Sequence, residues 1–147
     1  MTRLSVLMVL FFIINASPAF SQTTACEVGK QRIGGGYVFQ CAADGVHGTQ
    51  AALSDISVSA TWSTANNLCG SYGWRLPSIN ELGEMNKTIK GIANFDDEYW
   101  SADASGDYPC GYCGDYGKCS LYYSFSGTYF YCACNYTYYR VRCVDNF

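Results

Sequence analysis

The residues best suited to chemistry in this sequence are its nine cysteines. Four of them are closely spaced, as Cys110-x-x-Cys113 and Cys132-x-Cys134. Four thiolates at such spacing can close a tetrahedral zinc site, and a Cys-x-x-Cys pair can also be a redox centre. Redox pairs usually lie where a helix begins after a strand, whereas Cys110 and Cys113 lie in a stretch rich in glycine and tyrosine. A structural use of these thiols is therefore favoured over a redox one.

The N-terminal segment favours disulfides over zinc, because it has the pattern of an export signal. An apolar run from Leu4 to Ala16 follows Arg3, and small residues, Ala19 and Ser21, precede a cut after Ser21. The run is shorter than the roughly 20 residues of a membrane span. We therefore predict a signal peptide at 1–21, a single mature domain at 22–147 with no membrane span, and a secreted, periplasmic or cell-surface location. Exported chains form disulfides, so no metal site is expected.

An odd number of cysteines leaves at least one thiol without a partner inside the chain. That thiol is either free or bridged to another chain, which would make a homo-oligomer. Cys26 and Cys41 bracket a glycine-rich segment and could close it. The remaining connectivity stays open at this point, because spacing alone does not determine disulfide pairing.

No catalytic set accompanies these cysteines. His47 is the only histidine, and the sequence has no nucleophile elbow to pair with it. The run Asp96-Asp97-Glu98 could serve a glycoside hydrolase or bind calcium through its oxygens, but EF-hand spacing is absent. We therefore predict a non-enzymatic protein without a cofactor, with calcium as the one alternative.

Charge and composition limit the partners. The chain of 147 residues has a formal net charge of −3 and is 49% hydrophobic. Loss of Arg3 with the signal leaves eight basic and twelve acidic residues, a net charge of −4. A nucleic-acid-binding protein would carry a basic surplus, so nucleic acid is not an expected partner. The hydrophobic fraction is sufficient for a folded core.

Tyrosine is concentrated in one part of the chain. Ten of the thirteen tyrosines lie between Tyr108 and Tyr139, among serine, glycine and five of the cysteines. Tyrosine offers a large contact area with few rotatable bonds and a polar tip, as in antibody combining sites. Its ring can also stack on a sugar. Alternation along strands buries about half of such residues, and the others would form an aromatic binding surface.

The elements that position these residues follow from periodicity and turn signals. A glycine-rich lead at 34–36 precedes a strand from Tyr37 to Phe39, and a second strand is predicted at 48–54. Helices are predicted from Trp62 to Ser71 and from a capping box formed by Ser78 and Glu81. Ile79, Leu82 and Met85 of the second helix should face the core, and Arg75 should pair with a carboxylate or with carbonyls.

The second half of the chain is predicted to be strands. A short strand is expected at 99–101, and strands at 119–125 and 128–134 flank a two-residue turn at Ser126-Gly127. The segment 139–144 alternates apolar residues with Arg140 and Arg142, as in a half-buried strand. The order of strands, two helices and further strands indicates one α+β domain.

Several segments, taken in order, resemble one family, the Lcl C-terminal domain family, named after the terminal domain of a bacterial collagen-like adhesin. The resemblance covers roughly residues 33–145. It rests on Gly35-Gly36-Tyr37-Val38-Phe39, His47-Gly48 with Ala51-Ala52, Trp62 with Ala65 and Cys69, Gly73-Trp74-Arg75-Leu76-Pro77-Ser78 with Glu81-Leu82, Tyr99-Trp100-Ser101, and Val141-Arg142-Cys143-Val144.

The resemblance implies a C-type-lectin-like α+β fold in an exported or surface protein of the bacterial cell envelope. It also implies a disulfide between Cys69, in the first helix, and Cys143, in the last strand. The adhesin binds sulfated polysaccharides, whereas this chain is acidic. The Glu-Pro-Asn and Trp-Asn-Asp motifs of calcium-dependent lectins are missing, so that mode of sugar binding is not carried over. Residues 103–139 form a Tyr/Cys-rich insertion relative to the family pattern.

These observations predict a secreted or surface-exposed binding module for adhesion. Its partner would be a glycan or a cell-surface protein. The predicted ligand-binding residues are Tyr108, Tyr112, Tyr116, Tyr122, Tyr129, Tyr136 and Tyr138. The alternatives are a structural component of a cell-envelope assembly, bridged through the odd cysteine, and last a glycan-acting hydrolase that uses the carboxylates of 96–98.

Overall fold

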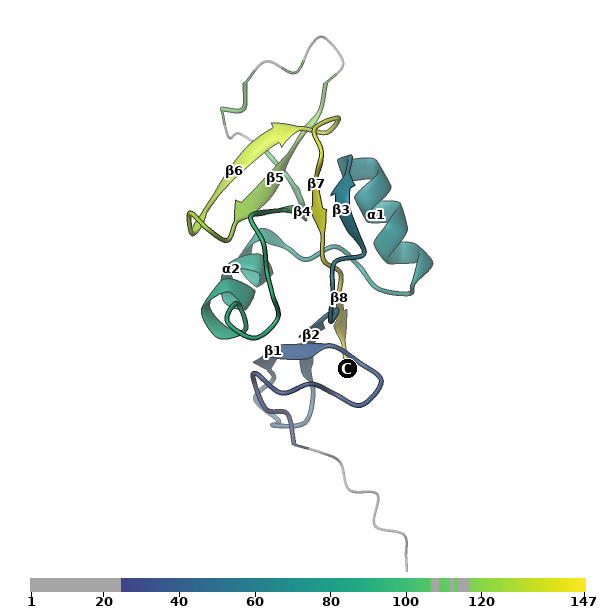
Figure 1. Cartoon of the computed structure of the whole chain (residues 1–147), viewed down its shortest axis with the longest axis vertical. Helices are drawn as coiled ribbons and strands as arrows, with labels where there is room; N and C mark the ends of the chain where they lie inside the picture. The colour runs from purple at the N-terminus through teal and green to yellow at the C-terminus, as the bar shows by residue number, and fades with distance from the viewer. Residues whose placement is uncertain (1–24, 107–108, 112, 114–116) are drawn as a thin grey trace, which may run out of the picture.

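The computed structural model describes residues 25–106, 109–111, 113 and 117–147 of the chain. These residues form an α+β fold with two helices and two sheets (Figure 1). The predicted signal segment, residues 1–21, lies outside the described residues. Within them, neither helix is long and apolar enough to cross a membrane.

The smaller sheet lies at one end of the molecule and contains the C-terminus (Figure 1). Its three antiparallel strands are β1 (Tyr37–Cys41), β2 (Gly48–Ala51) and β8 (Val144–Asn146), in the order β1-β2-β8. Gly36 leads into β1 at a point where a β-carbon would lie 1.8 Å from the carbonyl oxygen of Ala51. A glycine is therefore required at position 36, because the two backbones approach each other closely there.

The larger sheet has five strands in the order β3-β7-β4-β5-β6. Its strands are β3 (Ser57–Ala60), β4 (Glu98–Ala104), β5 (Cys119–Ser124), β6 (Tyr129–Cys134) and β7 (Tyr139–Val141). Pairing is antiparallel except between β4 and β7, where Tyr99 lies opposite Arg140 in a parallel arrangement. Strand β6 is at the edge of the sheet and carries three exposed aromatic residues, Tyr129, Phe130 and Tyr131.

The two helices agree with their sequence signals. Helix α1 (Trp62–Ser71) ends before Gly73, whose φ of +74° is the left-handed conformation that glycine adopts easily. Helix α2 (Ile79–Thr88) begins at the predicted capping box, in which Ser78 and Glu81 each bond to the other's backbone N–H. Arg75 also binds Glu81, through two hydrogen bonds of 2.6 and 2.7 Å, so its predicted pairing with a carboxylate is confirmed.

The large sheet separates two hydrophobic cores. Successive side chains of a strand point to opposite faces. Along β4, Tyr99 packs with Leu82 and Met85 of α2, whereas Trp100 packs with Ala65 and Cys69 of α1. All six residues are fully buried. Leu82 and Met85 of α2 face the core as predicted, and Ile79, also predicted to face it, packs against them while partly buried.

Four disulfides reinforce this arrangement. The pairs Cys26–Cys41 and Cys69–Cys143, both expected from the sequence, are bonded. Two further disulfides, Cys110–Cys132 and Cys113–Cys134, fix the segment before β5 to strand β6. Cys119 is the ninth cysteine and has a free thiol.

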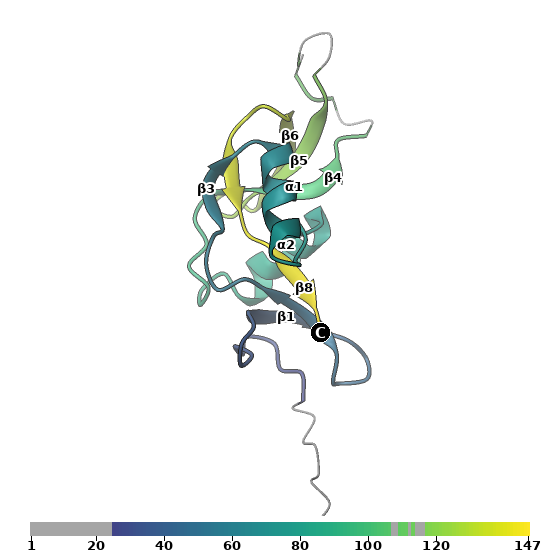
Figure 2. The same ribbon diagram turned by 90° about the vertical axis from the view of Figure 1, so that its right-hand side faces the viewer.

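Several predicted boundaries were wrong. The β5–β6 hairpin turns through four residues, 125–128, because its last cross-strand pair is Ser124–Tyr129. The predicted strand 139–144 is interrupted at Arg142 and Cys143, where the chain passes from the large sheet to the small one (Figure 2). Strand β3, which sequence patterning missed, is a short edge strand with only one fully buried residue, Ala60.

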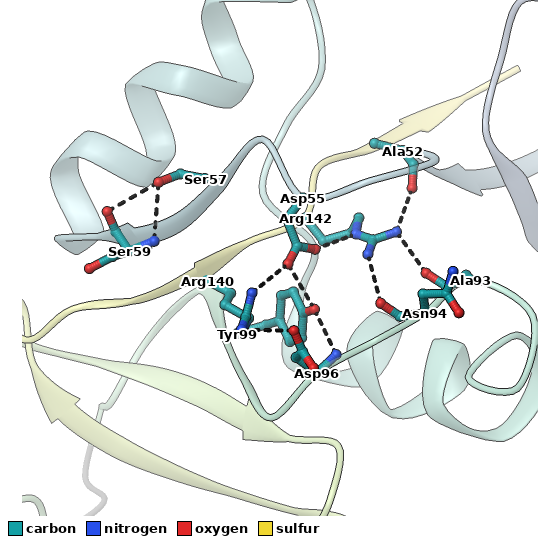
Figure 3. Close-up of polar contacts among 10 residues, drawn as sticks. All are labelled: Ala52, Asp55, Ser57, Ser59, Ala93, Asn94, Asp96, Tyr99, Arg140 and Arg142. Carbon is teal, nitrogen blue, oxygen red and sulfur yellow. Dashed lines mark hydrogen bonds and ion pairs between the residues drawn. The ribbon is translucent and has the colours of Figure 1, made fainter.

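Arg142 does not face solvent as the alternating pattern indicated; it is 2% exposed. Its guanidinium donates to Asp55 Oδ1 at 2.7 Å and to the backbone oxygens of Ala52, Ala93 and Asn94 (Figure 3). The guanidinium also lies over the Phe95 ring, 4.5 Å from its centroid. A buried charge is tolerated only when it is paired and hydrogen-bonded in this way.

Asp55 connects Arg142 to a wider network (Figure 3). Its second carboxylate oxygen accepts from the Tyr99 hydroxyl at 3.1 Å and from Arg140 at 3.2 Å. Arg140 in turn forms an ion pair with Asp96 at 2.7 Å. The network therefore joins the loop before β3, the start of β4 and the C-terminal segment at the junction of the two sheets.

We expect Arg142→Met to lower the free energy of unfolding by about 3–5 kcal/mol, because the largely buried Asp55 carboxylate would lose its closest cationic partner and keep only Arg140 at 3.2 Å. Urea denaturation measures this change. The matched control is Lys87→Met, which removes an exposed ion pair with Glu84 and should change stability by less than about 0.5 kcal/mol. Equal effects of the two substitutions would show that the Arg142 network is not a major source of stability.

Candidate functional site

The structure describes four of the seven tyrosines predicted to bind a ligand. Tyr108, Tyr112 and Tyr116 lie outside the described residues. Tyr122 is half-buried in β5, whereas Tyr129 is 51% exposed in β6. Tyr136 and Tyr138, between β6 and β7, are 62% and 64% exposed. The described tyrosines therefore divide into a sheet group and a turn group.

Cross-strand register brings the sheet group onto one face. Trp100, Tyr122 and Tyr131 lie directly opposite one another on β4, β5 and β6. Glu98, Ser124 and Tyr129 form the next row that points the same way. Exposure rises outward along the first row, from the fully buried Trp100 to Tyr131, which is 48% exposed. The first row is thus fixed in the core at Trp100 while its other end reaches solvent at Tyr131.

Tyr139 of β7 completes this surface, which we call the tyrosine face (Tyr122, Tyr129, Tyr131 and Tyr139). The Tyr139 ring stacks on Tyr122 with centroids 4.4 Å apart and meets Trp100 edge to face at 4.8 Å. Burial is the main cause that raises the pKa of both phenols, and the nearby charge of Glu98 raises both further. These rings are neutral donors and acceptors held in one geometry.

Glu98 adds a carboxylate to the tyrosine face. It lies in the row of Tyr129, and its charge contributes to the raised pKa of Tyr122 and Tyr139. Partial burial, and then the charge of Asp97, raises the pKa of Glu98 itself. Aromatic planes beside one carboxylate and several phenol oxygens can stack on an apolar ring and accept hydrogen bonds from hydroxyls around it.

Covalent links hold the neighbouring segment against β6. Cys110 is bonded to Cys132 and Cys113 to Cys134, and both Cys132 and Cys134 belong to β6, the strand of Tyr129 and Tyr131. The Tyr131 hydroxyl donates to the backbone oxygen of Pro109 at 3.2 Å. A binding surface stapled in this way loses little conformational freedom when a ligand binds.

A depression of about 400 Å³ lies beyond the end of β6, at the start of α1. It is lined by Thr61, Ser63, Gly117, Lys118, Asn135 and Tyr136. The side-chain oxygen of Asn135 is buried and has no hydrogen-bond partner among the described residues. Hydroxyls, an amide, an ammonium group and an exposed ring thus converge next to the turn tyrosines.

The other candidate residues do not form a reaction centre. The His47 ring lies 2.5 Å from Asp44 Oδ2, and hydrogen bonds from His47 and neighbouring amides hold the pKa of Asp44 well below its usual range. Within the described part of the chain, no hydroxyl or thiol is hydrogen-bonded to His47. The pair is exposed and serves the turn before β2.

The acidic run 96–98 is divided among separate partners. Asp96 pairs with Arg140, and Asp97 accepts hydrogen bonds from the hydroxyls of Ser124 and Ser126. Those two hydroxyls lower the pKa of Asp97, while Glu98 belongs to the tyrosine face. The three carboxylates therefore do not form one oxygen cluster of the kind that was considered for calcium.

Sequence reasoning missed Tyr131, Tyr139 and Lys118, and it assigned Glu98 to the acidic run 96–98 rather than to the aromatic surface. Tyr131 carries a signal that could have found it, because it lies two residues after Tyr129 in a predicted strand and so must share its face. Glu98 and Tyr139 join the surface only through the pairing of β4 with β5 and β7, which one sequence does not reveal.

Comparison with known proteins adds no relative to this picture. No family model matches the chain. No curated protein matches it either.

The raised phenol pKa values make a prediction about alkaline stability. Burial raises the pKa of Tyr99 to about 12 and raises those of Tyr122 and Tyr139 above the ordinary value of about 10. The unfolded chain therefore loses these protons first as the pH rises. The stability that these groups contribute is complete below about pH 10 and falls above it.

Urea denaturation between about pH 8 and pH 11 should show this fall, and Tyr139→Phe should make it shallower. An identical pH dependence for Tyr139→Phe and the unaltered protein would contradict the assigned environment of Tyr139.

Proposed function

We propose that this chain is an exported, non-enzymatic module that binds a glycan through the tyrosine face. The observation that carries the proposal is the row of aromatic residues anchored in the core at Trp100 and open to solvent at Tyr131. Exposed aromatic surfaces of this kind usually mark binding sites. The eight cysteines in disulfides and the export pattern of residues 1–21 support a location outside the reducing cytosol.

The proposed fold is C-type-lectin-like, as in the Lcl C-terminal domain family that the sequence resembles. The two helices, the mixed sheet and the disulfide from α1 to the last segment of the chain support this assignment. The Tyr/Cys-rich insertion at 103–139 would then carry the specificity. The class of ligand is inferred from the chemistry of the tyrosine face rather than from the family, because the family's adhesin binds sulfated polysaccharides whereas this chain is acidic.

A glycan is more complementary to this surface than the flat surface of a protein partner would be. Tyr129 and Tyr131 offer ring surfaces, and Glu98 with the phenol hydroxyls offers polar groups beside them. The depression next to Tyr136 provides further hydroxyl and amide groups at the end of the same strand. Sugars present apolar ring faces edged with hydroxyls, and aromatic planes bordered by acceptors are complementary to that pattern.

The test is a glycan array probed with oxidised residues 22–147 and with the double variant Tyr129→Ala/Tyr131→Ala. We expect selective binding by the unaltered protein and a loss of at least about tenfold in affinity for the variant, equal to about 1.4 kcal/mol. Tyr72→Ala is the matched control, because Tyr72 is 63% exposed at the end of α1 and is not part of the tyrosine face.

Calcium chelation should leave binding unchanged, since Asp96 and Asp97 have protein partners. A blank array would contradict a glycan ligand. Equal losses for the double variant and the Tyr72 control would contradict the assignment of the ligand to the tyrosine face.

A further inference from the structure

We propose that Cys113, Cys119 and Cys134 form a thiol–disulfide exchange site in which the free thiol moves between Cys119 and Cys134. The sulfur atoms of these three residues all lie within 4.8 Å of one another. Two of them form the disulfide Cys113–Cys134, and Cys119 is the free thiol. The inference is independent of any glycan ligand, because it concerns only bonds within the chain.

The register of the β5–β6 hairpin brings Cys119 to this disulfide. Cys119 lies directly opposite Cys134, and the backbone N–H of Asn135 donates to the carbonyl of Lys118 at 2.8 Å. A hydrogen bond between these flanking residues means that Cys119 and Cys134 do not exchange backbone hydrogen bonds with each other. In such non-hydrogen-bonded pairs the opposite side chains are closest. Two hydrogen-bonded strands therefore hold Cys119 and Cys134 face to face.

Cys113 supplies the sulfur that both strand cysteines can reach. Its Sγ is bonded to Cys134 Sγ, and Cys119 Sγ lies 2.7 Å from it. This separation is shorter than the roughly 3–3.5 Å at which reacting atoms are already close enough to attack. Cys113 is buried while Cys119 and Cys134 are half-buried, so the reaction can proceed without an external thiol entering the cluster.

The exchange is a balanced displacement. The Cys119 thiolate attacks Cys113 Sγ, forming a Cys113–Cys119 bond as the Cys113–Cys134 bond breaks. The electron pair of the broken bond leaves on Cys134 Sγ, which takes up the proton that Cys119 released. One disulfide and one thiol are present before and after, so no oxidant or reductant is consumed.

The exchange has a structural consequence for the Tyr/Cys-rich insertion. In the first state Cys113 is fastened to β6 through Cys134, and in the second it is fastened to β5 through Cys119. Cys110–Cys132 is outside the exchange and keeps the segment attached to β6 in both states. The protein can therefore change the strand that anchors Cys113 without losing a disulfide.

The test is to hold oxidised residues 22–147 at about pH 8, where thiols ionise enough to attack, and to quench samples in acid over time. Alkylation of the quenched thiol, digestion with pepsin at low pH and tandem mass spectrometry then locate the label and the disulfides. We expect label on both Cys119 and Cys134. The amount of the Cys113–Cys134 disulfide should match the label on Cys119, and the amount of the Cys113–Cys119 disulfide should match the label on Cys134. Label that stays on Cys119 alone at all times would overturn the proposal.

Two variants test each end of the exchange. Cys119→Ser should keep Cys113 bonded to Cys134 alone and should have no free thiol. Cys134→Ser should form Cys113–Cys119 and likewise show no free thiol. A free thiol at Cys113 or Cys119 in folded Cys134→Ser would contradict the proposal. If that variant does not fold, the time course of the unaltered protein still decides the question.

Discussion

The buried guanidinium of Arg142 is the constraint on which the rest of this fold depends. It lies where the C-terminal segment leaves the large sheet and enters the small one, and it bonds to backbone or carboxylate oxygens from two loops. The adjacent residue, Cys143, is bonded to Cys69 of α1. One dipeptide thus joins both sheets to a helix. A charge buried in this way is stable only if every partner is in place, which makes the junction specific.

The tyrosine face follows from that junction. The C-terminal segment places Tyr139 on β7, next to β4, and β4 in turn sets the register of β5 and β6. Trp100 is covered by α1, so the aromatic row has a fixed end in the core and a free end at the sheet edge. The cysteines add covalent links where the sheet ends, because no helix or further strand covers β6 in the described residues.

Much of the fold could be predicted from local patterns, whereas the site could not. The capping box at Ser78, the end of α1 near Gly73 and the Cys26–Cys41 pair depend on neighbouring residues, and the structure agrees with them. The burial of Arg142 depends on Asp55, which is distant in the sequence. The tyrosine face likewise depends on pairing between strands. Alternation predicted that half of these tyrosines would be exposed but did not reveal which face Tyr122 and Tyr139 share.

A glycan bound as proposed would contact the aromatic rings of the tyrosine face. The most direct measurement is nuclear magnetic resonance of residues 22–147 with labelled tyrosine rings, titrated with the oligosaccharide that binds most strongly on the array. We expect saturable shifts of the Tyr129 and Tyr131 ring signals, while the Tyr72 and Tyr37 signals stay unchanged. Shifts confined to Tyr72 or Tyr37 would place the ligand elsewhere and would contradict binding at the tyrosine face.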